Sequence, residues 1–322
     1  MDFALAAQNL ISPPVLFFAL GLGAALVRSE LSIPEAVAKT LSLYLMLAIG
    51  FKGGVAAAEH GLGADLLLLI GAAVALSFTM PLIAFGLLNA TTKLTRVDKA
   101  AIAAHYGSIS IVTFIAATAA LDAAMLAYPG TIVAAAAAME VPAIITALFL
   151  ARVGTAKTTD AGPTGQTPWR EVTLNGSVIL LIGAFVIGMA TGKTGYRDIA
   201  PFIDSPFKGI LCLFLLDMGL VAGRELRQVR RTLTPALLVF GLYMPLIGGV
   251  AGALAGKLIG LGTGGIALLS VLAASASYIA VPAAMRLALP EAKPALYLTL
   301  SLAITFPFNL TLGIPIYISL AG

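Results

Sequence analysis

The fold is decided by two polar interruptions inside long apolar runs, YGSISIVT at residues 106–113 and ASASYIAVP at residues 274–282. Each interruption contains a serine triplet of the form S-x-S, at 108–110 and at 275–277. In a membrane, unwound backbone is tolerated only where it is buried in protein or lines a cavity. Paired interruptions in two halves of a chain are the sequence feature that best indicates the binding site of a secondary transporter.

The composition places almost the whole chain in a membrane. Of the 322 residues, 60% are hydrophobic and 11% are charged, and the mean hydropathy is +1.02. A soluble domain carries roughly 25% charged residues, so soluble protein classes are excluded. The net charge of +4 is typical of membrane proteins with basic cytoplasmic loops and does not indicate nucleic-acid binding. A single cysteine, Cys212, excludes intramolecular disulfides.

Charged and Gly/Pro-rich breaks divide the sequence into ten apolar segments, each near the roughly 20 residues that a membrane-spanning helix needs. One long polar segment separates five spans from five, which predicts a first repeat at 1–152, a linker at 153–172 and a second repeat at 173–322. The predicted spans are 12–28, 33–52, 64–88, 98–121, 128–151, 173–191, 206–222, 233–259, 264–289 and 294–320.

The two halves share motifs in the same order, which indicates an internal duplication. Besides the serine triplets, the matches are a pair of glycines four residues apart, an identical tetrapeptide MPLI and a proline in the last span of each half. They stand at Ile49–Gly54 and Met218–Gly223, at Met80–Ile83 and Met244–Ile247, and at Val141-Pro142 and Phe306-Pro307.

An odd number of spans in each repeat inserts the second repeat upside down relative to the first. We therefore predict an all-α membrane protein of ten transmembrane helices, arranged as two inverted five-helix repeats with broken fourth and ninth helices. With both termini outside, fourteen of the nineteen Lys and Arg residues fall on the inner side, so the linker is predicted to be cytoplasmic.

The serine triplets are the predicted substrate site. Helices that restart there would present free backbone N–H groups and positive dipole ends to an anion, with hydroxyls adding hydrogen bonds. The predicted substrate-binding residues are Ser108, Ser110, Thr113, Ser275 and Ser277. The alternative is that these small residues only allow close packing between helices.

Ionisable and amide side chains inside apolar runs are the candidates for cation coupling, because such groups are costly in a membrane unless paired or solvated. They are Glu140, Asp217 and the amide Asn309, which follows the proline of the second repeat. The alternative for each carboxyl is a protonated group hydrogen-bonded to backbone. No His/Cys/Asp/Glu spacing indicates a metal site beyond a possible sodium ion, and no nucleophile with a base indicates an enzyme or a cofactor.

Several segments together resemble the sodium-dependent bicarbonate permeases known from cyanobacteria. They are Ile33–Ala36, Ile49–Gly54, Gly107–Thr113, Glu140–Ala143 and Ala273–Ser277, with Pro282 and Arg286. The resemblance implies a core and a gate domain, a homotrimer in the inner membrane of a bacterium, and bicarbonate with sodium bound near the two helix breaks. It also implies a PII-like cytoplasmic regulator.

Two departures from the pattern of that family make the predicted site more apolar. Ile111 and Val112 stand where the family has Gly-Ser, and Tyr278 stands where it has Asp. The leading prediction is a secondary active symporter of a small monovalent anion, most simply sodium-dependent bicarbonate uptake. The alternative is a proton- or sodium-coupled carrier of another small organic anion.

Overall fold

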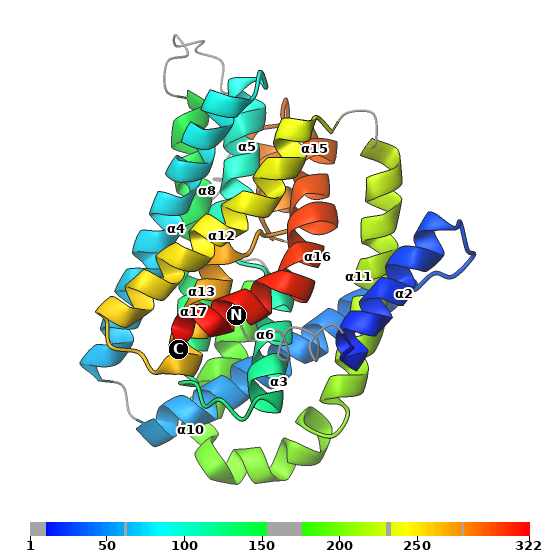
Figure 1. Ribbon diagram of the computed structural model, residues 1–322. Coiled ribbons are helices and arrows are strands. Elements are labelled where there is room, and N and C mark those ends of the chain that lie inside the picture. Colours follow the sequence, from blue (N-terminus) through cyan, green and yellow to red (C-terminus); the bar gives the residue numbers. More distant parts are fainter. Residues whose placement is uncertain (1–10, 61–62, 153–175, 230–232, 279) are drawn as a thin grey trace.

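The computed structural model describes residues 11–60, 63–152, 176–229, 233–278 and 280–322, and these residues form helices and connecting segments without any strand (Figure 1). The predicted linker at 153–172 lies outside the described residues. The helices are α2 (Pro13–Leu26), α3 (Glu35–His60), α4 (Ala64–Thr91), α5 (Arg96–Gly107), α6 (Ile111–Ala123), α7 (Ile132–Ala138), α8 (Glu140–Arg152), α10 (Gly176–Ile203), α11 (Phe207–Val229), α12 (Pro235–Leu258), α13 (Thr263–Ala274) and α14 (Ala280–Ala288). The last stretch is nearly continuous: α15 (Pro294–Leu298), η1 (Thr299–Thr305), α16 (Phe306–Phe308), η2 (Asn309–Gly313) and α17 (Ile314–Ala321).

This is an all-α membrane protein. Within the described residues, six helices are long and apolar enough to cross a membrane, or up to seven when the bent pair Ile182–Ile203 and Phe207–Arg227 is counted as one span. The number is below the predicted ten because α2 and α13 are shorter apolar helices and the bent pair covers two predicted spans.

Three predicted span ends are wrong. Helix α11 continues to Val229 instead of stopping at residue 222. Helix α3 continues through Gly53 and Gly54 to His60 instead of stopping at residue 52. Helix α10 continues to Ile203 instead of stopping at residue 191, with a bend at Gly192, whose φ of 56° and ψ of −147° are non-helical. Glycine reaches positive φ at no steric cost, so the chain bends there and resumes the helix.

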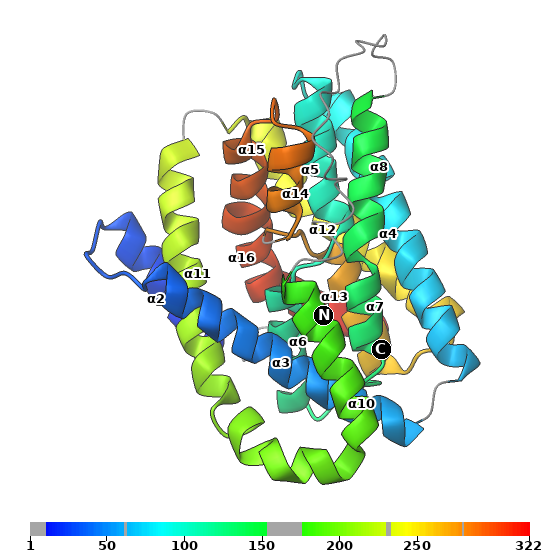
Figure 2. The same ribbon diagram turned by 180° about the vertical axis from the view of Figure 1, so that it is seen from behind.

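Helices α2 and α11 cross with their backbones in contact. A Cβ atom on Gly21 would overlap the carbonyl oxygen of Leu216, and one on Gly219 would overlap the carbonyl oxygen of Phe18. In both views this pair lies on the side of the molecule opposite α4 (Figures 1 and 2). Small residues allow such close approach and are the usual means of helix association in membranes.

Helices α3 and α10 cross in the same manner. A Cβ atom on Gly54 would overlap the carbonyl oxygen of Phe185, and one on Gly188 would overlap the carbonyl oxygen of Phe51. Helix α3 also contacts α11 and thus joins the two crossings. Using the names of the two domains that the resemblance implies, we call α2, α3, α10 and α11 the gate helices, and α4 to α8 together with α12 to α17 the core helices.

Candidate functional site

The first interruption separates α5 from α6. Helix α5 ends at Gly107, and Ser108 and Ser110 have extended backbone angles. The side chain of Ser110 starts the new helix: its Oγ accepts the backbone N–H of Thr113 at 3.2 Å and the Thr113 hydroxyl at 2.9 Å. This is an N-cap, so the break follows from a local preference of serine.

The second interruption separates α13 from α14. Helix α13 ends at Ala274, Ser275 is extended, and α14 begins at Ala280. The Oγ of Ser277, three residues before α14, accepts the backbone N–H of Val281 at 3.5 Å.

The two interruptions are hydrogen-bonded to each other in the interior of the protein. The backbone N–H of Ser110 donates to Ser275 Oγ at 2.9 Å, and the backbone N–H of Ser277 donates to the carbonyl oxygen of His105 at 2.8 Å. The five predicted substrate-binding residues are all between 1% and 4% exposed. The structure therefore brings Ser108, Ser110, Thr113, Ser275 and Ser277 together at one buried crossing.

The serine hydroxyls are largely occupied within the protein. Ser110 caps α6, Ser277 accepts the N–H of Val281, and Ser275 donates to the carbonyl oxygen of Leu272 at 2.9 Å. In contrast, the backbone N–H groups of Ile111 and Val112 make no hydrogen bond to another described residue. The donors available for a ligand are thus the first amides of α6, where the helix dipole favours negative charge.

Glu140 lies beside the crossing. Its side chain is 8% exposed, and its Oε2 accepts the hydroxyl of Ser108 at 2.7 Å. The residue begins α8, directly after Met139, whose carbonyl oxygen accepts the Ser77 hydroxyl at 2.6 Å. A carboxyl predicted to couple a cation is therefore in contact with the first interruption.

Asn309, in η2, holds the second interruption from a later helix of the same half of the chain. Its Nδ2 donates to the carbonyl oxygen of Ala274, the last residue of α13, at 2.9 Å. Its Oδ1 accepts the hydroxyl of Tyr317 at 2.7 Å, so the neutral oxygen that we expected to face a cation already has a partner.

Asp217 lies apart from the other candidates. It is buried on α11, and the described hydrogen bonds and ion pairs connect it neither with Glu140 nor with the interruptions. Its charged neighbour is Arg224, about two turns later on the same helix. Among the residues that the structure describes, no three His, Cys, Asp or Glu side chains are grouped as metal ligands.

Sequence reasoning missed Thr305, which links α5 to α12. Tyr106 donates its hydroxyl to Thr305 Oγ1 at 2.7 Å, and Thr305 donates to the carbonyl oxygen of Gly241 at 2.7 Å. The sequence contained an indication of this residue. When Pro142 of the first half is matched with Pro307 of the second half, Thr305 corresponds to Glu140, because each lies two residues before its proline.

A cavity of about 190 Å³ lies between α3 and one face of α6. The α6 side of its lining is Phe114, Thr118 and Asp122, spaced by one helical turn. Lys52 lines the gate side, where its Nζ pairs with Asp204 Oδ1 at 2.9 Å. The cavity therefore follows α6 from one turn beyond the first interruption to the exposed end of the helix.

A second cavity, of about 290 Å³, lies on another face of α6. The α6 side is an alanine stripe, Ala116, Ala119, Ala120 and Ala123. The remaining lining comes from α2, α11, η2 and α17, including Lys208 and Cys212. Helix α6 is thus loosely packed against the gate helices on both sides.

Comparison with known proteins identifies the family. A search of curated proteins found no match. The model of the Na+-dependent bicarbonate transporter superfamily matches residues 13–322, essentially the whole chain. That family consists of transporters, not enzymes. The chain belongs to the Na+-dependent bicarbonate transporter superfamily.

Proposed function

We propose that the protein is a sodium-driven symporter that imports bicarbonate, with the substrate bound at the crossing of the two interruptions. The observation that carries the proposal is the pair of hydrogen bonds from Ser110 N–H to Ser275 and from Ser277 N–H to His105, which joins two helix breaks at one buried place. The unpaired amides at the start of α6 suit the bicarbonate for which the family is named, because anions bind at helix N-termini.

The proposal includes ten spans in two inverted repeats. Three contacts between helices support it, because each recurs between the corresponding helices when the two repeats are exchanged. The contact of α2 with α11 corresponds to that of α10 with α3. The contact of α4 with α5 corresponds to that of α12 with α13, and the contact of α5 with α8 corresponds to that of α13 with α17.

The glycine crossings support the same repeat and correct its register. Gly188 follows Gly21 by 167 residues, and Gly219 follows Gly54 by 165, and each of these four glycines meets a backbone carbonyl oxygen of the opposite repeat. In this proposal Gly54, rather than Gly50, is the counterpart of Gly219, one helical turn from the match suggested by the motif alone.

Alternating access, in this proposal, moves the core helices against the gate helices. The gate crossings are in backbone contact and have no room to slide, whereas two cavities separate α6 from the gate. A loosely packed interface can change with little loss of contact, because close-packed interiors are far less deformable. The cavity with Lys52 and Thr118 would lead the anion from the outer side toward the interruption.

Sodium enters the proposal as a transported ion held near Glu140. A buried carboxyl with one described hydrogen bond, from Ser108, keeps oxygen lone pairs free for a cation. Hard cations such as sodium favour oxygen ligands.

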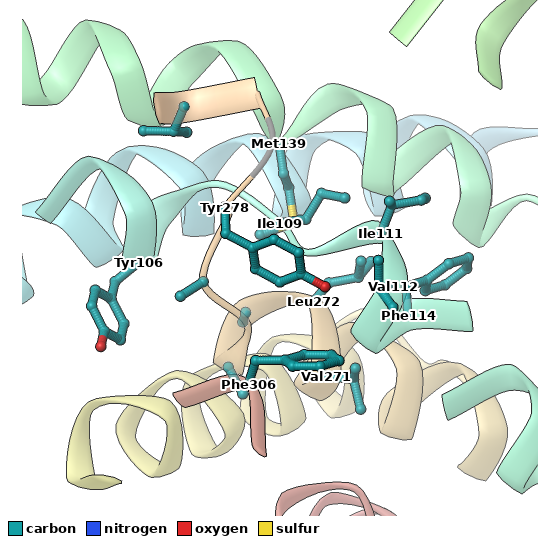
Figure 3. Packing of buried hydrophobic residues seen from close by; sticks show 14 of the residues in the cluster. Tyr106, Ile109, Ile111, Val112, Phe114, Met139, Val271, Leu272, Tyr278 and Phe306 are labelled. Atoms are coloured by element: carbon teal, nitrogen blue, oxygen red, sulfur yellow. The ribbon is translucent and has the colours of Figure 1, made fainter. Parts of the chain in front are cut away.

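One observation favours a second substrate class, a small organic anion with an apolar part. Ile109, Ile111 and Val112 line the first interruption with apolar side chains, as Figure 3 shows. A monocarboxylate with a short alkyl group would bury that group there, whereas bicarbonate presents only polar atoms.

The deciding experiment is uptake of labelled bicarbonate into proteoliposomes. With sodium outside and choline inside, the proposal expects uptake above the equilibrium level, and choline on both sides should remove it. Uptake of labelled acetate in competition with bicarbonate separates the two substrate classes. Bicarbonate uptake that persists without sodium at fixed pH would contradict the sodium-driven mechanism.

Assembly belongs to the same proposal. The family resemblance suggests a homotrimer in the inner membrane and a PII-like regulator on the cytoplasmic side. Light scattering of the purified protein measures the first, and retention of a purified PII-like protein by proteoliposomes measures the second.

A further inference from the structure

The side chain of Tyr278 carries a buried hydroxyl without a partner. The residue is 9% exposed, and its hydroxyl oxygen is buried with no hydrogen bond to the described residues. Buried polar groups in proteins are nearly always hydrogen-bonded, so an unpaired phenol indicates a partner that is absent from the apoprotein. A tyrosine hydroxyl donates one hydrogen bond, which suits an anionic oxygen.

This hydroxyl points at the start of α6. Figure 3 shows the ring between Phe306 and Ile109 with its oxygen directed toward Val112. The ring packs edge-on against Phe306, with centroids 5.3 Å apart, which fixes its direction. The hydroxyl also lies near the side chain of Ser110 without meeting hydrogen-bond geometry.

The hydroxyl is therefore directed toward the N-terminal end of α6, where the first two amides are free. Ile111 and Val112 offer backbone N–H groups to the same region, and α6 is a helix of 13 residues with its positive dipole end there. The phenol comes from the second repeat and the amides come from the first, so the donors converge only after the chain has folded.

We propose that Tyr278 is a substrate-binding and specificity-determining residue, which donates its hydroxyl to a carboxylate-type oxygen of the anion held by the first amides of α6. This inference rests on the proposed function, and it adds the residue and the chemical class that the site selects. The selected group is a small planar oxyanion such as bicarbonate, formate or acetate. A neutral donor set without lysine or arginine binds weakly enough to release the anion on the other side.

The test compares Tyr278→Phe with the wild type and with Tyr243→Phe. Tyr278→Phe keeps the ring against Phe306 and removes only the hydroxyl. Tyr243 is the matched control, because its hydroxyl is also buried without a described partner and its ring also packs on a phenylalanine, Phe240, at 5.5 Å. Thermal unfolding of the purified proteins is followed against concentrations of bicarbonate, formate, acetate and chloride, and binding appears as stabilisation.

We expect at least one oxyanion to stabilise the wild type and Tyr243→Phe at similar concentrations, and Tyr278→Phe to need roughly tenfold more, as for a lost hydrogen bond to a charged group. Equal titration curves for wild type and Tyr278→Phe, or no oxyanion-dependent stabilisation of the wild type, would overturn the inference. A loss of equal size in Tyr243→Phe would overturn it as well.

Uptake measurements separate this inference from the proposed function. If the wild type and Tyr278→Phe import bicarbonate with equal KM values, the proposed function stands and the role of Tyr278 is overturned. If the wild type does not import bicarbonate but binds formate or acetate more tightly than Tyr278→Phe does, the bicarbonate assignment is overturned and the inference about Tyr278 stands.

Discussion

At the scale of single residues, Glu140 and Asp217 show how similar sequence signals lead to different environments. Both are acidic residues inside apolar runs and both are buried. Glu140 contacts Ser108 in the first interruption, whereas Asp217 contacts none of the residues at the crossing through the described hydrogen bonds. The cost of burying a carboxyl marks both positions as candidates, but only contact with the site separates them.

Replacing Glu140 by Gln should abolish the sodium dependence of transport. The amide keeps the shape and can still accept the hydrogen bond from Ser108, but it removes the charge that a cation needs. The measurement is initial uptake rate against sodium concentration in proteoliposomes. Asp217→Asn makes the same chemical change away from the crossing and should leave the sodium dependence unchanged. Equal effects of both variants would remove Glu140 from the coupling role.

Replacing Ser110 by Ala should affect both stability and binding. The serine caps α6 through the Thr113 N–H, so its loss should cost about 1 kcal/mol of unfolding free energy. Thr95 caps α5 by accepting the N–H of Asp98 at 3.1 Å, so Thr95→Ala is the control with the same loss away from the crossing.

The readouts are SDS-induced unfolding and anion affinity. Both variants should unfold more easily, but only Ser110→Ala should weaken the affinity, because it loosens the amides of α6. Affinity lost to the same degree in Thr95→Ala would show that stability alone controls binding.

At the scale of elements, α6 is the helix that connects the binding site with the gate. Its first amides face the crossing, one of its faces lines the cavity with Lys52, and its alanine stripe lines the larger cavity. Protein interiors are close-packed, so a buried helix usually has few voids beside it. The two cavities beside α6 therefore mark its interface with the gate helices as the place where we expect motion.

Filling the larger cavity should slow transport and leave binding intact. Ala120→Leu adds three carbon atoms at a position that lines the cavity of about 290 Å³, so folding should tolerate it. The uptake rate should fall at least tenfold, while the anion concentration for half-maximal thermal stabilisation should stay unchanged. Ala75→Leu is the control, because Ala75 is exposed on α4. An unchanged uptake rate in Ala120→Leu would show that the cavity plays no part in the transport motion.

At the scale of the whole molecule, the inverted repeat predicts where each loop faces. Lys93, between α4 and α5, is on the predicted inner side, and Lys257, at the end of α12, is on the predicted outer side. Both side chains are exposed, which makes them suitable for labelling.

Single cysteines test this arrangement in a Cys212→Ala background, which removes the native thiol. In intact cells, a membrane-impermeant maleimide should label Lys257→Cys and should label Lys93→Cys only after the membrane is opened. Labelling of Lys93→Cys in intact cells would contradict the predicted orientation and, with it, the external position of both termini.

The sequence by itself determined the membrane class, the places where α5 and α13 end and the grouping of serines there, because composition and helix capping are local properties. Only the tertiary structure decided which groups meet. The Ser110–Ser275 hydrogen bond joins residues 165 positions apart, the oxygen of Asn309 is taken by Tyr317, and the hydroxyl of Tyr278 points toward the start of α6. Capping depends on neighbours within a helical turn, whereas these contacts depend on how two repeats pack, which a single sequence expresses only through weak matches such as the glycine register.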